Sequence, residues 1–166
     1  FRGETEPMDP VAGLIPGSLN RPASQNLNPD FTFKSAAVLR TEFERLLAGV
    51  RGNLAMLADL AGELEPFLAE RPAFEPAAAA ALESAPARAL CGELAAALES
   101  LAEWSEEGVK STIRSTGARL GLKGRDLFQP ARAALTGRAH GPELPLVASL
   151  LGRERCVVRL RDAAAV

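Results

Sequence analysis

Residues 128–160 read FQPARAALTGRAHGPELPLVASLLGRERCVVRL, and this stretch decides the fold class. Its apolar residues recur at helical spacing, and Gly152 separates two of the runs. The pattern predicts helices at about residues 125–135, 142–151 and 153–164. A loop that contains Pro142 and the chain's single histidine, His140, joins the first two.

Helical spacing continues toward the N-terminus. A first helix is expected from about Phe33 to Gly52, and Asn53 can cap a second helix that Pro66 limits. Ser105 is expected to begin a further helix that stops at Gly121. Between the helix that Pro66 limits and the helix that Ser105 begins, the pattern predicts two more helices. One is short and Ala-rich, at about 76–83, and the other is longer, at about 86–103, with Pro86 in its first turn and Leu101 as the last apolar residue. No strand-like alternation exceeds four residues, so the sequence predicts an all-α fold.

Three segments are expected along the chain. Residues 1–30 are rich in Pro and Gly, show no helical period, and predict an irregular arm or linker. Residues 31–104 and 105–166 predict two helical subdomains. The first residue is Phe1 rather than Met, which suggests a processed chain or an excised fragment.

Composition favours helices that bury a core. Apolar residues make up 47% of the 166 residues, there is no Tyr, and Ala and Leu dominate. No apolar run approaches the roughly 18–20 residues that a membrane span needs. Cys91 and Cys156 lie far apart within helical patterns, and two buried free thiols are favoured over a disulfide, which stays possible.

Charge is divided along the chain. Residues 54–108 carry a net charge of −9, residues 109–140 carry +6, and residues 153–162 carry +2. The whole molecule is slightly acidic, at −2. The division predicts that one face or end meets a polyanion.

Signals for catalysis are absent from the sequence. It has no zinc-ligand spacing and no Gly-rich phosphate loop, and one histidine cannot complete a catalytic triad with a neighbouring base. We therefore expect no cofactor and no metal, and we expect that the free chain is not an enzyme.

Three motifs resemble a known family. They are the closing stretch 128–160, the segment Leu101–Glu107 with its Glu-Trp-Ser sequence, and the turn Gly121-Leu122-Lys123. In order and spacing they are similar to the C-terminal anticodon-binding region of bacterial-type glutamyl-tRNA synthetase, a class I aminoacyl-tRNA synthetase. The resemblance is strong over residues 100–162, looser over 33–75, and absent over 1–30. It implies two helical-cage subdomains around splayed anticodon bases. The His-Ile-Gly-His-like and Lys-Met-Ser-Lys-like elements of the catalytic core do not occur here.

The resemblance also implies RNA-binding residues. Arg132 falls on the family's Pro-x-Arg position, and Arg114 falls on an arginine late in the preceding helix. The loop from Ala139 to Leu144 falls on the family's Pro-containing loop that contacts the second and third anticodon bases. The implied contacts are His140, Gly141, Pro142 and Leu144, together with the preceding Arg138. Family members that separate glutamate from glutamine anticodons place an arginine where Asn53 stands here, with Arg51 two positions earlier. That departure puts discrimination at the third anticodon base in doubt.

Several of these residues keep a structural alternative. Arg114 and Arg132 can form salt bridges instead of binding RNA, and His140 can stack on a base or have no role. Trp104 is expected in the core at the junction of the two subdomains rather than as a stacking platform. If the RNA-binding interpretation is right, Arg114 and Arg132 should converge on one concave surface.

Two functions remain open from the sequence. The leading hypothesis is a module that binds a glutamate-type tRNA alongside the catalytic body of a synthetase. The alternative is a non-catalytic structural subunit of a larger assembly, such as an organellar ribosome. The expected location is the cytoplasm, or the mitochondrial matrix or plastid if a transit peptide has been removed.

Overall fold

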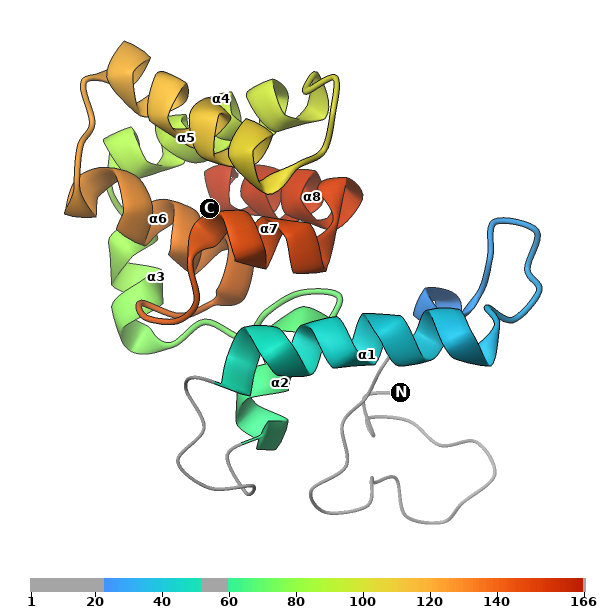
Figure 1. Ribbon diagram of the computed structural model, residues 1–166. Coiled ribbons are helices and arrows are strands. Elements are labelled where there is room, and N and C mark those ends of the chain that lie inside the picture. Colours follow the sequence, from blue (N-terminus) through green and yellow to red (C-terminus); the bar gives the residue numbers. More distant parts are fainter. Residues whose placement is uncertain (1–22, 52–59, 166) are drawn as a thin grey trace. The chain divides into compact units, whose positions relative to one another are not determined.

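The computed structural model describes residues 23–51 and 60–165 (Figure 1). Within these ranges the chain forms eight α-helices and one short 3-10 helix, and its β-type pairing is limited to an isolated bridge between Leu27 and Phe33. The predicted all-α fold class is confirmed. By packing, the chain divides into two compact units, residues 1–70 and 71–166.

The first unit contains α1 (Ala36–Val50) and α2 (Leu60–Leu68), which contact each other. The Ser35 hydroxyl accepts a hydrogen bond from the N–H of Val38 at 3.3 Å, and this side-chain cap begins α1. Both helices contribute apolar side chains to the core of this unit: Leu46, Val50, Leu64, Phe67 and Leu68 are buried.

Two expectations for the first unit need correction. Pro66 does not limit the second helix but lies inside α2, which continues to Leu68 because Phe67 and Leu68 are buried against the core. The end of the expected arm is also structured. Residues 23–26 form the 3-10 helix, and the Gln25 side chain donates a hydrogen bond to the Leu68 carbonyl at 3.1 Å. Residues 1–22 of the arm lie outside the described residues.

The second unit packs six helices around one core. They are α3 (Pro76–Leu82), α4 (Ala85–Glu99), α5 (Glu106–Leu120), α6 (Arg125–Thr136), α7 (Leu144–Leu151) and α8 (Arg153–Ala164). Helices α4 and α8 share the most extensive contact, and α4 also contacts α5 and α6 (Figure 1). Leu90, Leu94 and Leu98 repeat every four residues on one face of α4, and all three are buried. This stripe places α4 at the centre of the unit.

The division by packing differs from the predicted subdomain boundary at residues 104–105. That boundary falls inside the second unit, because α4, which precedes it, packs on α5 and α8, which follow it. Helix α4 is also shorter than predicted and ends at Glu99, so Leu101 lies beyond it. The Ser100 hydroxyl donates to the carbonyls of Ala96 and Ala97, at 3.0 and 3.2 Å, and so satisfies the end of the helix.

Other predicted helix ends are confirmed. The Ser105 hydroxyl accepts from the N–H of Gly108 at 3.1 Å and begins α5, while Gly121 ends it with φ of 68°. Pro86 lies in the first turn of α4, and Gly152 separates α7 from α8. Cys91 and Cys156 are free, buried thiols, as expected. Over the described residues, none of the helices combines the length and apolar character needed to cross a membrane.

Candidate nucleic-acid interface

The predicted RNA-binding loop begins where α6 ends. Helix α6 closes at Thr136, and Gly137 takes φ of 70°, a left-handed conformation that favours glycine. The Thr136 hydroxyl donates to the Arg132 carbonyl at 2.9 Å and accepts from the N–H of Arg138 at 3.2 Å. One side chain thus holds both the last turn of the helix and the first residue of the loop.

Arg132 is half-buried and reaches across the loop. Its Nη1 atom donates a hydrogen bond to the carbonyl of Pro142. Burial lowers the pKa of Arg132, and the negative charge of Glu143 opposes that effect. Because an arginine guanidinium stays protonated in proteins, its positive charge remains. Arg132 therefore holds the loop through this hydrogen bond and keeps a positive charge beside it.

Arg138 forms an ion pair with a residue from a distant part of the chain. Its Nε lies 3.8 Å from Oε1 of Glu75, the residue that precedes α3. The backbone N–H of Glu75 also donates to the Gly137 carbonyl at 2.8 Å. The segment before α3 therefore supports the start of the loop. Sequence reasoning missed this contact because it joins residues 62 or 63 positions apart.

The remaining predicted loop residues differ in accessibility. His140 and Gly141 are exposed, and Pro142 is half-buried. Gly141 has φ of 145°, which few other residues adopt without strain. Leu144 is only 2% exposed, because it forms the first turn of α7 and packs into the core, so an RNA contact through its side chain is not favoured and its role stays a prediction.

The other three predicted contacts lie outside this loop in the sequence. Arg114 lies on α5 with an exposed side chain, and it makes no hydrogen bond or ion pair within the ranges that the structure describes. Its convergence with Arg132 stays a prediction. Arg51 is exposed just after α1 in the first unit, and Asn53 lies outside the described residues.

Trp104 agrees with the structural alternative only in part. It is half-buried, and the guanidinium of Arg153 lies over its ring, 5.6 Å from the centroid. This cation–π contact occupies one face of the ring.

The loop presents groups that bind rather than react. An imidazole, two guanidinium groups and exposed backbone suit contacts with unpaired bases and phosphates. Residues 23–51 and 60–165 contain no cluster of three His, Cys, Asp or Glu residues that could hold a metal ion. The imidazole, guanidinium and backbone groups of the loop suit recognition by hydrogen bonding, stacking and charge.

Known structures define the class of the fold. It is similar to the crystal structure of a glutamate tRNA ligase from Elizabethkingia meningosepticum, with a TM-score of 0.68 over 87% of this chain and 27% of that chain, at 21% identity. The glutamate-tRNA synthetase of Elizabethkingia anophelis is also similar, with a TM-score of 0.62, 21% identity, and coverage of 87% of this chain and 26% of that one. The fold is thus an all-α domain of the type found in these ligases.

The family follows from the sequence comparisons. A family model described as "Anticodon binding domain" matches residues 24–164, so this chain belongs to the anticodon-binding domain family. Among its relatives, the glutamate–tRNA ligase of Nitrobacter winogradskyi is 35% identical over 85% of this chain and 29% of that protein. The glutamate–tRNA ligase of Azorhizobium caulinodans is 33% identical over 96% of this chain and 32% of that protein. The resemblance to the anticodon-binding region of bacterial-type glutamyl-tRNA synthetase is confirmed.

The chain spans about a quarter to a third of the length of these relatives. It corresponds to their anticodon-binding part. Nothing in the comparisons supports the alternative of a structural subunit in a ribosome.

Proposed function

We propose that this chain binds the anticodon loop of a glutamate-type tRNA and that the catalytic core of the ligase is not part of it. The observation that carries the proposal is the match of the anticodon-binding family to residues 24–164, which includes the loop that Arg132 and Thr136 hold. Unpaired loop bases offer edges and π-faces that a helical surface with arginines can read.

The chemistry of the loop supports this function. Arg132, which donates to the Pro142 carbonyl, and Arg138, two residues before the exposed His140, supply positive charge, while Glu143 and Glu75 offset it. Phosphate contacts position an RNA and base contacts specify it, and the cations and the imidazole of this loop suit both kinds of contact. In the complete ligase we propose that the catalytic body charges the tRNA that this domain grips. The expected cytoplasmic location, with its organellar alternative, stays a prediction.

The test is a titration of the whole chain with a glutamate tRNA at about 50 mM and about 200 mM salt. Binding should be measurable at the lower concentration and should weaken at the higher one, because each neutralised phosphate releases counterions. A folded chain that binds no glutamate tRNA at low salt would contradict the proposal.

A further inference from the structure

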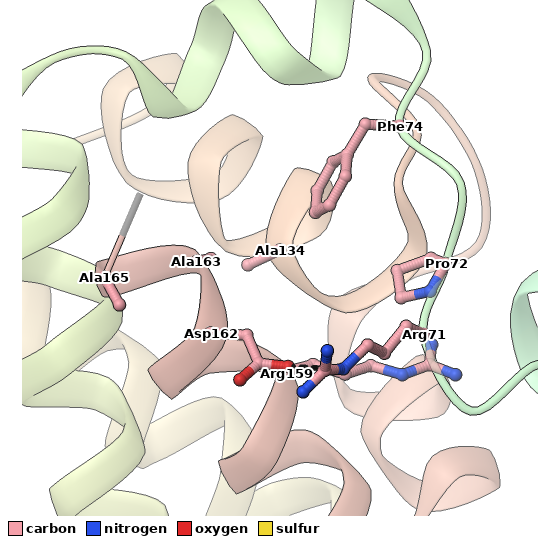
Figure 2. Close-up of a pocket in the computed structure, with 8 residues that line it drawn as sticks. All are labelled: Arg71, Pro72, Phe74, Ala134, Arg159, Asp162, Ala163 and Ala165. Carbon is pink, nitrogen blue, oxygen red and sulfur yellow. Dashed lines mark ion pairs between the residues drawn. The ribbon is translucent and has the colours of Figure 1, made fainter.

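A pocket of about 340 Å³ lies in the second unit, and none of the predicted RNA-binding residues lines it (Figure 2). Its volume falls within the range of roughly 300–1,000 Å³ typical of small-ligand sites. One side is the segment before α3, with Arg71 and Phe74. The other side is formed by α8, with Arg159, Asp162 and Ala163, and Ala134 of α6 contributes an apolar surface.

The polar side of the pocket places a donor beside an acceptor. Nε of Arg71 lies 3.0 Å from Oδ2 of Asp162. That oxygen is buried and forms no hydrogen bond within the part of the chain that the structure describes. Because the Asp162 side chain is nonetheless 45% exposed, its other oxygen, Oδ1, is the polar atom open to a ligand. The Arg71 side chain is 70% exposed and offers further N–H groups beside it.

A buried arginine joins the two helices that line the pocket. Arg159 is 2% exposed, and its Nη1 donates to the Leu135 carbonyl at 2.5 Å, which ties α8 to α6. Two arginines and one aspartate give the pocket a net positive charge. The pocket therefore suits a ligand that is hydrogen-bonding on one edge and carries a negative group.

The apolar side provides a flat aromatic surface. Phe74 is 45% exposed, and Figure 2 shows its ring directed toward Ala134 across from the polar groups. A planar ring system between Phe74 and the alanines would have its edge directed at Arg71 and Asp162. Each nucleobase combines a π-face with a hydrogen-bond donor next to an acceptor on its Watson–Crick edge.

The segment that lines one side of the pocket also contacts the start of the candidate interface. The segment that carries Phe74 packs directly on the turn after α6: a Cβ on Gly137 would lie 2.1 Å from the Ala73 carbonyl oxygen. Glu75, next to Phe74, is hydrogen-bonded to Gly137 and ion-paired with Arg138. The segment before α3 therefore joins the pocket to the turn at which the loop begins.

We propose that this pocket is an additional subsite for one unpaired nucleobase, which stacks on Phe74 and hydrogen-bonds to Arg71 and Asp162. The proposal rests on the proposed function, since it requires that the chain bind tRNA. It adds a contact outside the loop and makes Phe74 and Asp162 determinants of RNA affinity.

The first arm of the test changes the aromatic ring. Titrations of the whole chain with glutamate tRNA would compare Phe74→Leu, Phe74→Tyr and the wild type. Stacking predicts that Phe74→Leu weakens binding by roughly 5- to 150-fold and that Phe74→Tyr retains it. Phe128→Leu is the matched control, because Phe128 is also a partly exposed phenylalanine of the second unit, at 39%, and should bind as the wild type does.

The second arm separates hydrogen bonding from general charge. Asp162→Ala removes a negative charge, so attraction of the RNA backbone alone would tighten binding. Loss of an acceptor for a base would weaken it, and the proposal predicts weaker binding. Circular dichroism and thermal unfolding would show that each variant is folded.

The outcomes distinguish the two proposals. If the wild type binds tRNA and neither Phe74→Leu nor Asp162→Ala weakens binding, the subsite is refuted and the proposed function stands; a pocket that serves a protein partner would give this result. If the folded wild type binds no tRNA, the proposed function fails and the subsite fails with it.

Discussion

At the scale of single residues, Arg132 has a structural role that the sequence did not reveal. The family resemblance marked its position as a base contact, with a salt bridge as the alternative. The structure shows instead a hydrogen bond to the Pro142 carbonyl, ten residues along the chain. Such a bond depends on how the loop folds back, which residue spacing does not determine. Arg132 is thus a positioning residue for the loop, and direct base reading by it stays a prediction.

Replacing Arg132 should weaken tRNA binding. We expect Arg132→Ala to cost roughly 1–3 kcal/mol of binding free energy. Arg132→Lys should recover only part of it, because lysine keeps the charge but lacks the planar fork. Titration with tRNA measures the first effect, and hydrogen exchange at the amides of residues 139–141 measures loosening of the loop. Arg40→Ala is the control, since Arg40 is exposed and its ion pair is with Glu44, one turn further along the same helix. Unchanged affinity in Arg132→Ala would contradict this role.

The buried thiols predict a loss of stability at high pH. Burial raises the pKa of Cys91 and Cys156 to about 12, from an ordinary value of 9.0. The folded state therefore favours the neutral thiols. Their contribution is fully present below about pH 9 and is lost as the pH rises toward 12. Between pH 9 and about pH 10.5, each thiol should lower the free energy of unfolding by up to roughly 2 kcal/mol.

Urea unfolding at neutral pH and at about pH 10.5 would measure this loss. The chain has no tyrosine, so no phenol titrates in the same range. In Cys91→Ala/Cys156→Ala the difference between the two pH values should shrink. An equal pH dependence in this variant and the wild type would show that the thiols are not responsible.

At the scale of elements, local signals predicted helix ends better than helix lengths. Ser105, Gly121 and Gly152 act as the sequence indicated, because capping depends on residues within one turn. Two predicted helix ends were wrong: α2 continues past Pro66, and α4 ends before Leu101. Core packing extends α2 past its proline, and the Ser100 cap ends α4 before its predicted last leucine. Packing joins helices that are distant in the sequence, so the apolar spacing within one segment does not predict it.

The two left-handed glycines that end α5 and α6 should respond differently to a side chain. Gly121 and Gly137 have φ of 68° and 70°, so alanine at either costs roughly 1–2 kcal/mol in backbone strain. A Cβ at Gly121 meets nothing within 4 Å, whereas at Gly137 it would lie 2.1 Å from the Ala73 oxygen. We expect Gly137→Ala to lose about 1–3 kcal/mol more stability than Gly121→Ala.

Chemical denaturation of both variants would test this difference. Gly121→Ala is the matched control, because it shares the backbone strain without the collision. Equal losses of unfolding free energy would mean that the segment before α3 is not held against the end of α6.

At the scale of the whole molecule, the fold class and family could be predicted from the sequence, but the division into units and the pocket could not. The helical period runs through residues 33–164, so an all-α fold followed directly. The boundary depended on which helices pack together, and α4 packs on helices that follow it. One signal for the pocket was present: Arg159 lies on the same stripe as Cys156, Leu160 and Ala163, all of which are buried. A charged residue at a position that the helical period assigns to the core needs polar partners there, and so indicates a polar site beside the apolar core.

The measurement that tests the central claim most directly compares two tRNAs. One is a glutamate tRNA, and the other is the same tRNA with all three anticodon bases replaced; both are titrated with the whole chain at low salt. Recognition of the anticodon predicts that the altered tRNA binds at least roughly tenfold more weakly. Equal affinity for the two would show that the chain holds only the RNA backbone, and it would contradict the assignment.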